Sequence, residues 1–118
     1  MSSAPVKIDH LLYRLLQEEN IDAFNAARQR GETCDLSNAR LRGLKLRNMD
    51  ARGLNMSGAY MKQADLRGVD FRDTCLEGAS IYEANVSGVY FPEELRPYEI
   101  FMSVQLGTRL RYRKKELP

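Results

Sequence analysis

The sequence has few of the side chains that build metal and disulfide sites. Its 118 residues contain no tryptophan, one histidine and only two cysteines. Zinc sites and disulfide frameworks need several Cys or His residues at characteristic spacings, and none occurs here. We therefore expect no metal and no cofactor. The single histidine, His10, falls in an expected helix, where a place on the helix surface or in a cap contact is favoured over a role as general base.

Long hydrophobic runs and a strong net charge are also missing. Nowhere do eighteen apolar residues follow one another, and the first residues lack the apolar stretch of a signal peptide. The phosphate-binding patterns GxxxxGK and GxGxxG are absent. The formal net charge is only +2, from 18 basic and 16 acidic residues. These absences predict a soluble cytoplasmic protein that has no membrane segment and is not an enzyme.

The chain does contain a five-residue repeat, which runs from Cys34 to Glu93 without an insertion. Cut into fives, it reads CDLSN ARLRG LKLRN MDARG LNMSG AYMKQ ADLRG VDFRD TCLEG ASIYE ANVSG VYFPE. The third position is always apolar, and the first is small or apolar except for Thr74. A strict period of five drifts around a helix and changes face along a strand. The repeat therefore predicts the stacked coils of a solenoid, in which first and third positions point inward.

These units resemble the A(D/N)LxX consensus of the pentapeptide-repeat family, over residues 34–93. The resemblance implies an all-β solenoid, a right-handed quadrilateral β-helix with four units per coil and hence about three coils. Residues twenty apart would then lie above one another, ~4.8 Å per coil. Because the family has Asp or Asn at the second position, the aspartates there are expected to be structural rather than catalytic: Asp35, Asp50, Asp65 and Asp70.

Three segments are expected, because the open ends of a repeat stack need caps. They are an N-terminal helical cap over residues 1–33, the β-helix over 34–93, and a C-terminal helix with a basic tail over 94–118. The first helix is expected from Lys7, with its apolar residues at helical spacing: Ile8, Leu11, Leu12, Leu15 and Leu16. A second helix is expected from Asp22 to Gly31, burying Ile21, Ala23, Phe24 and Ala27.

The C-terminal helix is expected from Pro97 to Gly107, with Ile100, Phe101 and Val104 on one side. Those residues would either close the last coil of their own chain or form a homodimer, as in family members that dimerise through a C-terminal helix. Beyond the helix, TRLRYRKK alternates like a strand, with Leu110 and Tyr112 on one face and arginines on the other.

The outward second and fourth positions predict where a partner binds. One side of the coils displays three cations and two aromatic rings with no acid, and these are the predicted partner-binding residues: Arg40, Arg42, Tyr60, Lys62 and Tyr82. Arginine and tyrosine are typical of interface anchors. The competing interpretation is that these cations only solvate the surface, as exposed Lys and Arg usually do.

Three functions remain open on the sequence. The favoured one is a non-enzymatic protein-protein interaction module or scaffold. The second follows the family's acidic members, which mimic duplex DNA and act on DNA gyrase; it fits poorly, since residues 34–93 carry eight basic and eight acidic residues. The third is weak binding of nucleic acid or another polyanion through the basic faces, which would depend strongly on salt.

Overall fold

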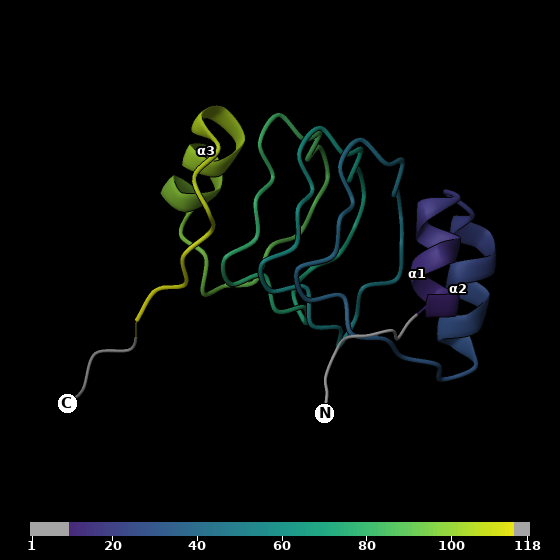
Figure 1. Ribbon diagram of the computed structural model, residues 1–118. Helices are drawn as coiled ribbons and strands as arrows, with labels where there is room; N and C mark the ends of the chain where they lie inside the picture. The colour runs from purple at the N-terminus through teal and green to yellow at the C-terminus, as the bar shows by residue number, and fades with distance from the viewer. Residues whose placement is uncertain (1–9, 115–118) are drawn as a thin grey trace, which may run out of the picture.

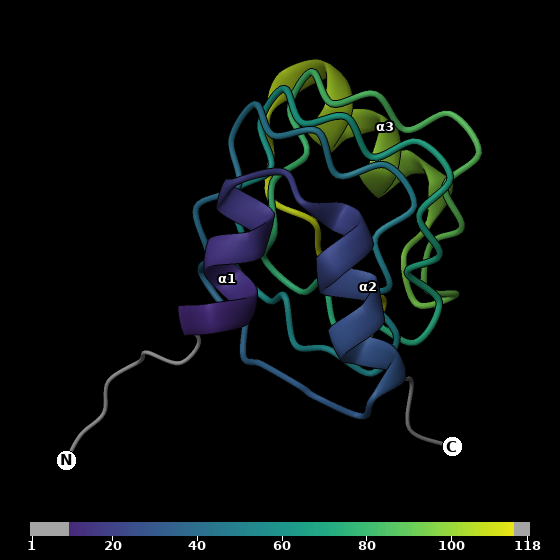
Figure 2. The same ribbon diagram turned by 90° about the vertical axis from the view of Figure 1, so that its right-hand side faces the viewer.

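The helices lie at the two ends of the molecule, with the repeats between them. The computed structural model describes residues 10–114, which include α1 (His10–Gln17), α2 (Ile21–Gln29) and α3 (Pro97–Leu106). Figure 1 shows α1 and α2 at one end of a stack of backbone coils and α3 at the other. In Figure 2, seen from the α1–α2 end, the coils follow one another around a common axis and the two helices lie across the opening.

Backbone pairing joins residues that are twenty apart. Seven isolated parallel bridges connect second positions of successive coils, such as Asp35 with Asn55 and Asn55 with Cys75. The hydrogen bonds run the same way: Leu41 N donates to Tyr60 O at 2.8 Å, and Tyr60 N donates to Ala39 O at 2.8 Å. The coil therefore has the twenty-residue register that the family resemblance implies.

The expectation of regular β structure needs correction. Between residues 10 and 114 the structure has no strand, and pairing is limited to single bridges. The reason is geometric: each unit spends two of its five residues in a turn, so too little extended chain remains for consecutive ladder pairs. The alternating segment after α3 likewise forms no strand as far as Lys114, and Lys115 lies outside the described residues.

The core runs along the axis of the stack. All third-position side chains are buried except Val86 and Phe91, which are partly buried. Thr74, the one hydroxyl at a first position, is 3% exposed, and its Oγ1 donates to Ala51 O at 2.7 Å. That bond satisfies a buried polar group that would otherwise be costly. The inward positions of the repeat are thus the positions that form the core.

Corners at the fifth position use the left-handed backbone region. Glycine suits such corners because it tolerates positive φ, and a Cβ built on Gly58 would overlap the Asn38 side chain in the coil below. Gln63 and Glu83 also have positive φ, at 61° and 58°. Their side chains are hydrogen-bonded to each other, from Gln63 Nε2 to Glu83 Oε1 at 2.9 Å. The coil register thus imposes a turn on residues that do not favour it.

The N-terminal helices bury part of the expected apolar set. Leu12 and Leu16 of α1 are buried, but Leu11 is 60% exposed, which corrects its expected place in the buried stripe. Lys7, Ile8 and Asp9 lie outside the described residues. Helix α2 begins at Ile21, one residue before the expected start, because Asn20 Oδ1 accepts from Ala23 N at 3.2 Å and caps it. Its buried residues are Phe24 and Ala27.

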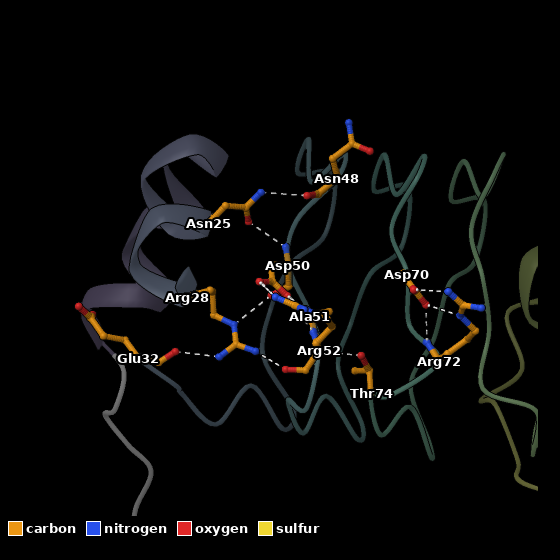
Figure 3. A network of polar contacts seen from close by, with 10 residues as sticks. All are labelled: Asn25, Arg28, Glu32, Asn48, Asp50, Ala51, Arg52, Asp70, Arg72 and Thr74. Carbon is orange, nitrogen blue, oxygen red and sulfur yellow. Dashed lines mark hydrogen bonds and ion pairs between the residues drawn. The ribbon is translucent and has the colours of Figure 1, made fainter. Parts of the chain in front are cut away.

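Helix α2 covers the first coil through side chains (Figure 3). Asn25 Oδ1 accepts from Asp50 N at 2.8 Å, and its Nδ2 donates to Asn48 O at 3.0 Å. Arg28 donates to the carbonyl oxygens of Asp50 and Arg52. These bonds satisfy backbone groups that point away from the second coil.

The opposite end is covered by α3 and by residues 107–113, which we call the C-terminal strap. Leu110 O accepts from Gly78 N at 2.7 Å, and Leu110 N donates to Ala79 O at 2.8 Å. Val104 O accepts from Glu83 N at 3.0 Å. The Leu110 side chain is fully buried, so the strap also closes the apolar interior.

The buried face of α3 is polar, contrary to expectation. Glu99 is 9% exposed and Ser103 is 0% exposed, whereas Phe101 is 60% exposed. Ser103 Oγ accepts from Ile81 N at 3.1 Å, which supplies the open edge of the third coil with an acceptor. Gly107 ends the helix as expected, with φ of 79°. The need to pair the coil's backbone therefore decides which face of α3 turns inward.

Candidate interaction surface

The predicted partner-binding residues share one side of the coils. Bridges stack Tyr60 on Arg40 and Ser80 on Tyr60. The central residue of each unit on this side is fully buried, and these residues are Leu41, Met61 and Ile81. The residues before and after each of them therefore point outward. With Arg109, introduced below, this side is called the basic face: Arg40, Arg42, Tyr60, Lys62, Tyr82 and Arg109.

Arg109 joins this side from the C-terminal strap. Its Nη1 donates to Gly78 O at 2.6 Å and its Nη2 to Tyr60 OH at 3.1 Å. Its guanidinium carbon lies 5.0 Å from the centre of the Tyr60 ring. The sequence pattern did not place Arg109 here, because it lies outside the repeats and 49 residues from Tyr60. A fourth cation therefore belongs to the basic face.

The second tyrosine also carries a cation. Lys62 Nζ lies 5.5 Å from the centre of the Tyr82 ring. Tyr82 is partly buried because the strap crosses it, and a Cβ built on Gly107 would lie 3.3 Å from its ring. Tyr60 is 48% exposed. The two rings thus hold cations in place, since a cation over an aromatic face is attracted by its quadrupole.

Acidic partners neutralise cations elsewhere on the molecule. Three ion pairs join second and fourth positions of one unit: Arg52 with Asp50 at 3.0 Å, Arg67 with Asp65 at 2.7 Å and Arg72 with Asp70 at 2.7 Å. Arg111 of the strap pairs with Glu99 at 2.7 Å. Among residues 10–114 no such pair involves the four cations of the basic face. This side therefore keeps its positive charge.

The paired carboxyl groups show the effect of these contacts. Hydrogen bonds from Arg67 lower the pKa of Asp65 to about 2, and those from Arg72 lower the pKa of Asp70 to about 2. Arg111 likewise lowers the pKa of Glu99. Each carboxylate therefore remains ionised, and paired with its arginine, at pH values well below neutral.

The helix residues predicted for a dimer or a cap do not share one environment. Ile100 and Val104 are partly buried, and Val104 provides the carbonyl that pairs with Glu83. Phe101 points away from the coils together with other apolar side chains of α3, Tyr98 at 64% and Leu106 at 66% exposure. The helix thus closes its own coil with one face and leaves three apolar side chains exposed.

Reactive groups do not gather in the described part of the chain. Residues 10–114 contain no group of three or more His, Cys, Asp or Glu side chains arranged to hold a metal ion. Both cysteines are free, and burial raises the pKa of the partly buried Cys34 to about 11. None of the three helices described is long and apolar enough to cross a bilayer.

Comparison with protein families agrees with the five-residue period. A family model for pentapeptide repeats matches residues 34–73 with eight copies. Residues 34–73 of the chain are pentapeptide repeats. The match covers the first two coils, and the bridges continue in the same register to Tyr90. Searches of curated proteins and of solved structures gave no match.

Proposed function

We propose that this pentapeptide-repeat protein is a non-enzymatic interaction module of the cytoplasm that binds another protein through the basic face. One observation carries the proposal: four cations share one side, and no acid among the described residues pairs with them, whereas four arginines on other sides are each paired with a carboxylate: Arg52, Arg67, Arg72 and Arg111. Repeat stacks offer pre-organised surfaces, so a partner binds at little cost in ordering entropy.

The proposal includes the architecture that presents this surface. We assign residues 34–93 to a right-handed quadrilateral β-helix of three coils, residues 1–33 to an N-terminal cap, and residues 94–118 to a C-terminal helix and tail. The bridges between residues twenty apart support four five-residue units per coil. The bonds from α2, α3 and the strap to the end coils support the two caps.

Charge reversal tests the function. The variant R40E/R42E/K62E is compared with R47E/K45E/R113E, which makes the same change in net charge with exposed residues off the basic face. Each tagged protein is used for affinity capture from a lysate of its host, with and without nuclease, and bound proteins are identified by mass spectrometry. We expect one protein species to bind wild type and the control but not the first variant.

Stability must stay constant for that comparison to hold. Surface substitutions usually change stability by less than about 0.5 kcal/mol, so both variants should unfold near the wild-type temperature. Retention of the same species by folded R40E/R42E/K62E would place the contact elsewhere. Loss of that species on nuclease treatment would favour nucleic-acid binding instead.

A homodimer through α3 is a second proposal, supported by three exposed apolar side chains of the helix. Tyr98, Phe101 and Leu106 are each at least 60% exposed and lie on one short helix. Exposed apolar patches mark interaction sites more often than isolated apolar residues do. Sedimentation of wild type and Phe101→Glu tests this: a dimer that becomes a monomer supports it, and a wild-type monomer at high concentration excludes it.

Mimicry of duplex DNA fits the surface poorly. The repeats carry equal numbers of acidic and basic residues, and three of the aspartates are neutralised by arginines of the same unit. Duplex DNA presents one negative charge per ~1.7 Å of its axis. A stack of three coils with paired carboxylates does not reproduce that charge.

A further inference from the structure

We propose that the basic face binds an extended acidic segment of a partner protein, with carboxylates at alternate residues. This inference rests on the proposed function and names the chemistry of the partner. Its basis is the arrangement of the four cations, which form two rows and two columns on one side of the stack.

The rows follow from the repeat. Arg40 and Arg42 flank the buried Leu41, so both point outward, Arg40 from a bridge position and Arg42 from the start of the turn that follows. Two residues of fully extended chain span ~6.6 Å, which limits how far apart their Cα atoms lie. The second row lies one coil higher: Arg109 covers Tyr60, which stacks on Arg40, and Lys62 O accepts from Gly43 N beside Arg42 at 2.8 Å.

An extended peptide has the matching period. Its alternate side chains point to the same face and recur every ~6.6 Å. A segment with carboxylates at alternate residues therefore meets successive cations of a row without bending. A helix presents its neighbours at a spacing of three and four residues and does not match two adjacent positions of one unit.

The cations of the upper row are already held in place. Arg109 is fixed by Gly78 O, by Tyr60 OH and by the Tyr60 ring, and Lys62 lies over Tyr82. Long side chains that are ordered before binding lose less entropy when they meet a carboxylate. Arg109 thus makes the strap part of the binding surface as well as part of the cap.

Acidic residues border the basic face and favour a short acidic segment over a nucleic acid. Glu77 lies on the preceding side, where its Oε1 accepts from Tyr112 N at 3.1 Å. Glu83 lies at the next corner, bonded to Gln63. A phosphate backbone that crossed this side along the third coil would pass these carboxylates, whereas a segment that spans only the cations would not. Like charges at such short range are repelled.

Two labelled peptides test the inference by fluorescence anisotropy. One alternates glutamate and threonine; the other has the same length and composition but groups both residues in pairs, so that no two glutamates on one face of an extended chain are adjacent. We expect the alternating peptide to bind at least about tenfold more tightly, a difference of about 1.4 kcal/mol. Equal affinities would overturn the proposed geometry.

Protein variants and an oligonucleotide complete the test. R40E/R42E/K62E should abolish binding of the alternating peptide, R109A should weaken it by about tenfold, and R47E/K45E/R113E should leave it within about twofold. Tighter binding of an oligothymidylate of the same length than of the peptide would overturn the acidic segment in favour of nucleic acid. Absence of peptide binding, together with charge-dependent capture of a protein from lysate, would overturn this inference and leave the proposed function standing.

Discussion

At the α1–α2 end of the stack, side chains form hydrogen bonds with the backbone of the first coil. At the α3 end, backbone atoms of the strap form many of the hydrogen bonds with the last coil. The side chains of Asn25 and Arg28 in α2 form hydrogen bonds with several backbone groups of the first coil. Leu110 and Val104 offer their own carbonyl oxygens to coil three. A side-chain cap depends on the identity of each residue, whereas a backbone cap depends on whatever holds the segment in place.

The strap is held by one buried apolar side chain and by polar contacts of its other residues. Leu110 is fully buried among the last coil's core residues. Tyr112 OH accepts from Leu76 N at 2.8 Å and donates to Thr74 O at 3.2 Å, and Arg111 pairs with Glu99. We therefore expect different substitutions to open the two ends of the stack.

The middle coil contacts the coils at both ends, so a substitution in its core is expected to cause the largest loss of stability. Leu66→Asp places a carboxylate at a position that is fully buried, where no partner is available to it. We expect the whole protein to be unfolded at 25 °C, with loss of the native circular dichroism signal. Leu66→Met, which nearly conserves volume, should cost less than about 1.5 kcal/mol. A folded Leu66→Asp protein would contradict the register of the coils.

Removal of the strap's apolar anchor should open one end only. Leu110→Ala leaves a cavity and should lower the free energy of unfolding by about 2–5 kcal/mol. Hydrogen exchange should show reduced protection of the Gly78 amide, which donates to Leu110 O, while the Asp50 amide at the other end keeps its protection. Equal loss of protection at both amides would show that the ends are not independent.

Removal of a capping side chain at the α1–α2 end is expected to cause a smaller loss of stability. Arg28→Ala leaves the carbonyl oxygens of Asp50 and Arg52 without their donor and should cost about 1–3 kcal/mol. Arg30→Ala is the matched control, because Arg30 is exposed and its one ion pair among residues 10–114 is with Glu32; it should cost less than about 0.5 kcal/mol. If the two variants unfold at the same temperature, Arg28 contributes no more than a surface ion pair.

Sequence periodicity predicted the parts of the fold that depend on local pattern. The inward positions and the end of α3 at Gly107 follow from residue type and spacing, and the twenty-residue register follows from the resemblance to the pentapeptide-repeat family. The inner face of α3 was not predictable in this way. Glu99 and Ser103 are buried because Arg111 and the Ile81 amide need partners, and those contacts exist only once the strap and the third coil have come together.

The candidate surface shows the same limit. The repeat placed Arg40, Arg42 and Lys62 on one side, since twenty-residue spacing stacks them in columns. It gave no indication of Arg109, whose contact with Tyr60 spans 49 residues and depends on where the strap crosses the coil. Contacts between a repeat and a non-repeated tail have no period, so the pattern of the repeats contains no information about them.

The smallest predicted effect is a loss of stability at low pH, which should arise at the α3 end but not at the α1–α2 end. Arg111 lowers the pKa of Glu99 at the α3 end, whereas Arg28 at the other end bonds to carbonyl groups, which do not titrate. A carboxylate with a lowered pKa in the folded state stabilises the fold above its ordinary pKa near 4.5, and this contribution is lost as pH falls below that value. In Glu99→Gln the contribution is absent at every pH. Thermal unfolding should therefore show wild type above Glu99→Gln at pH 7, with the difference shrinking as pH is lowered from about 4.5 toward 2; a constant difference would mean that Glu99 acts through packing rather than through its charge.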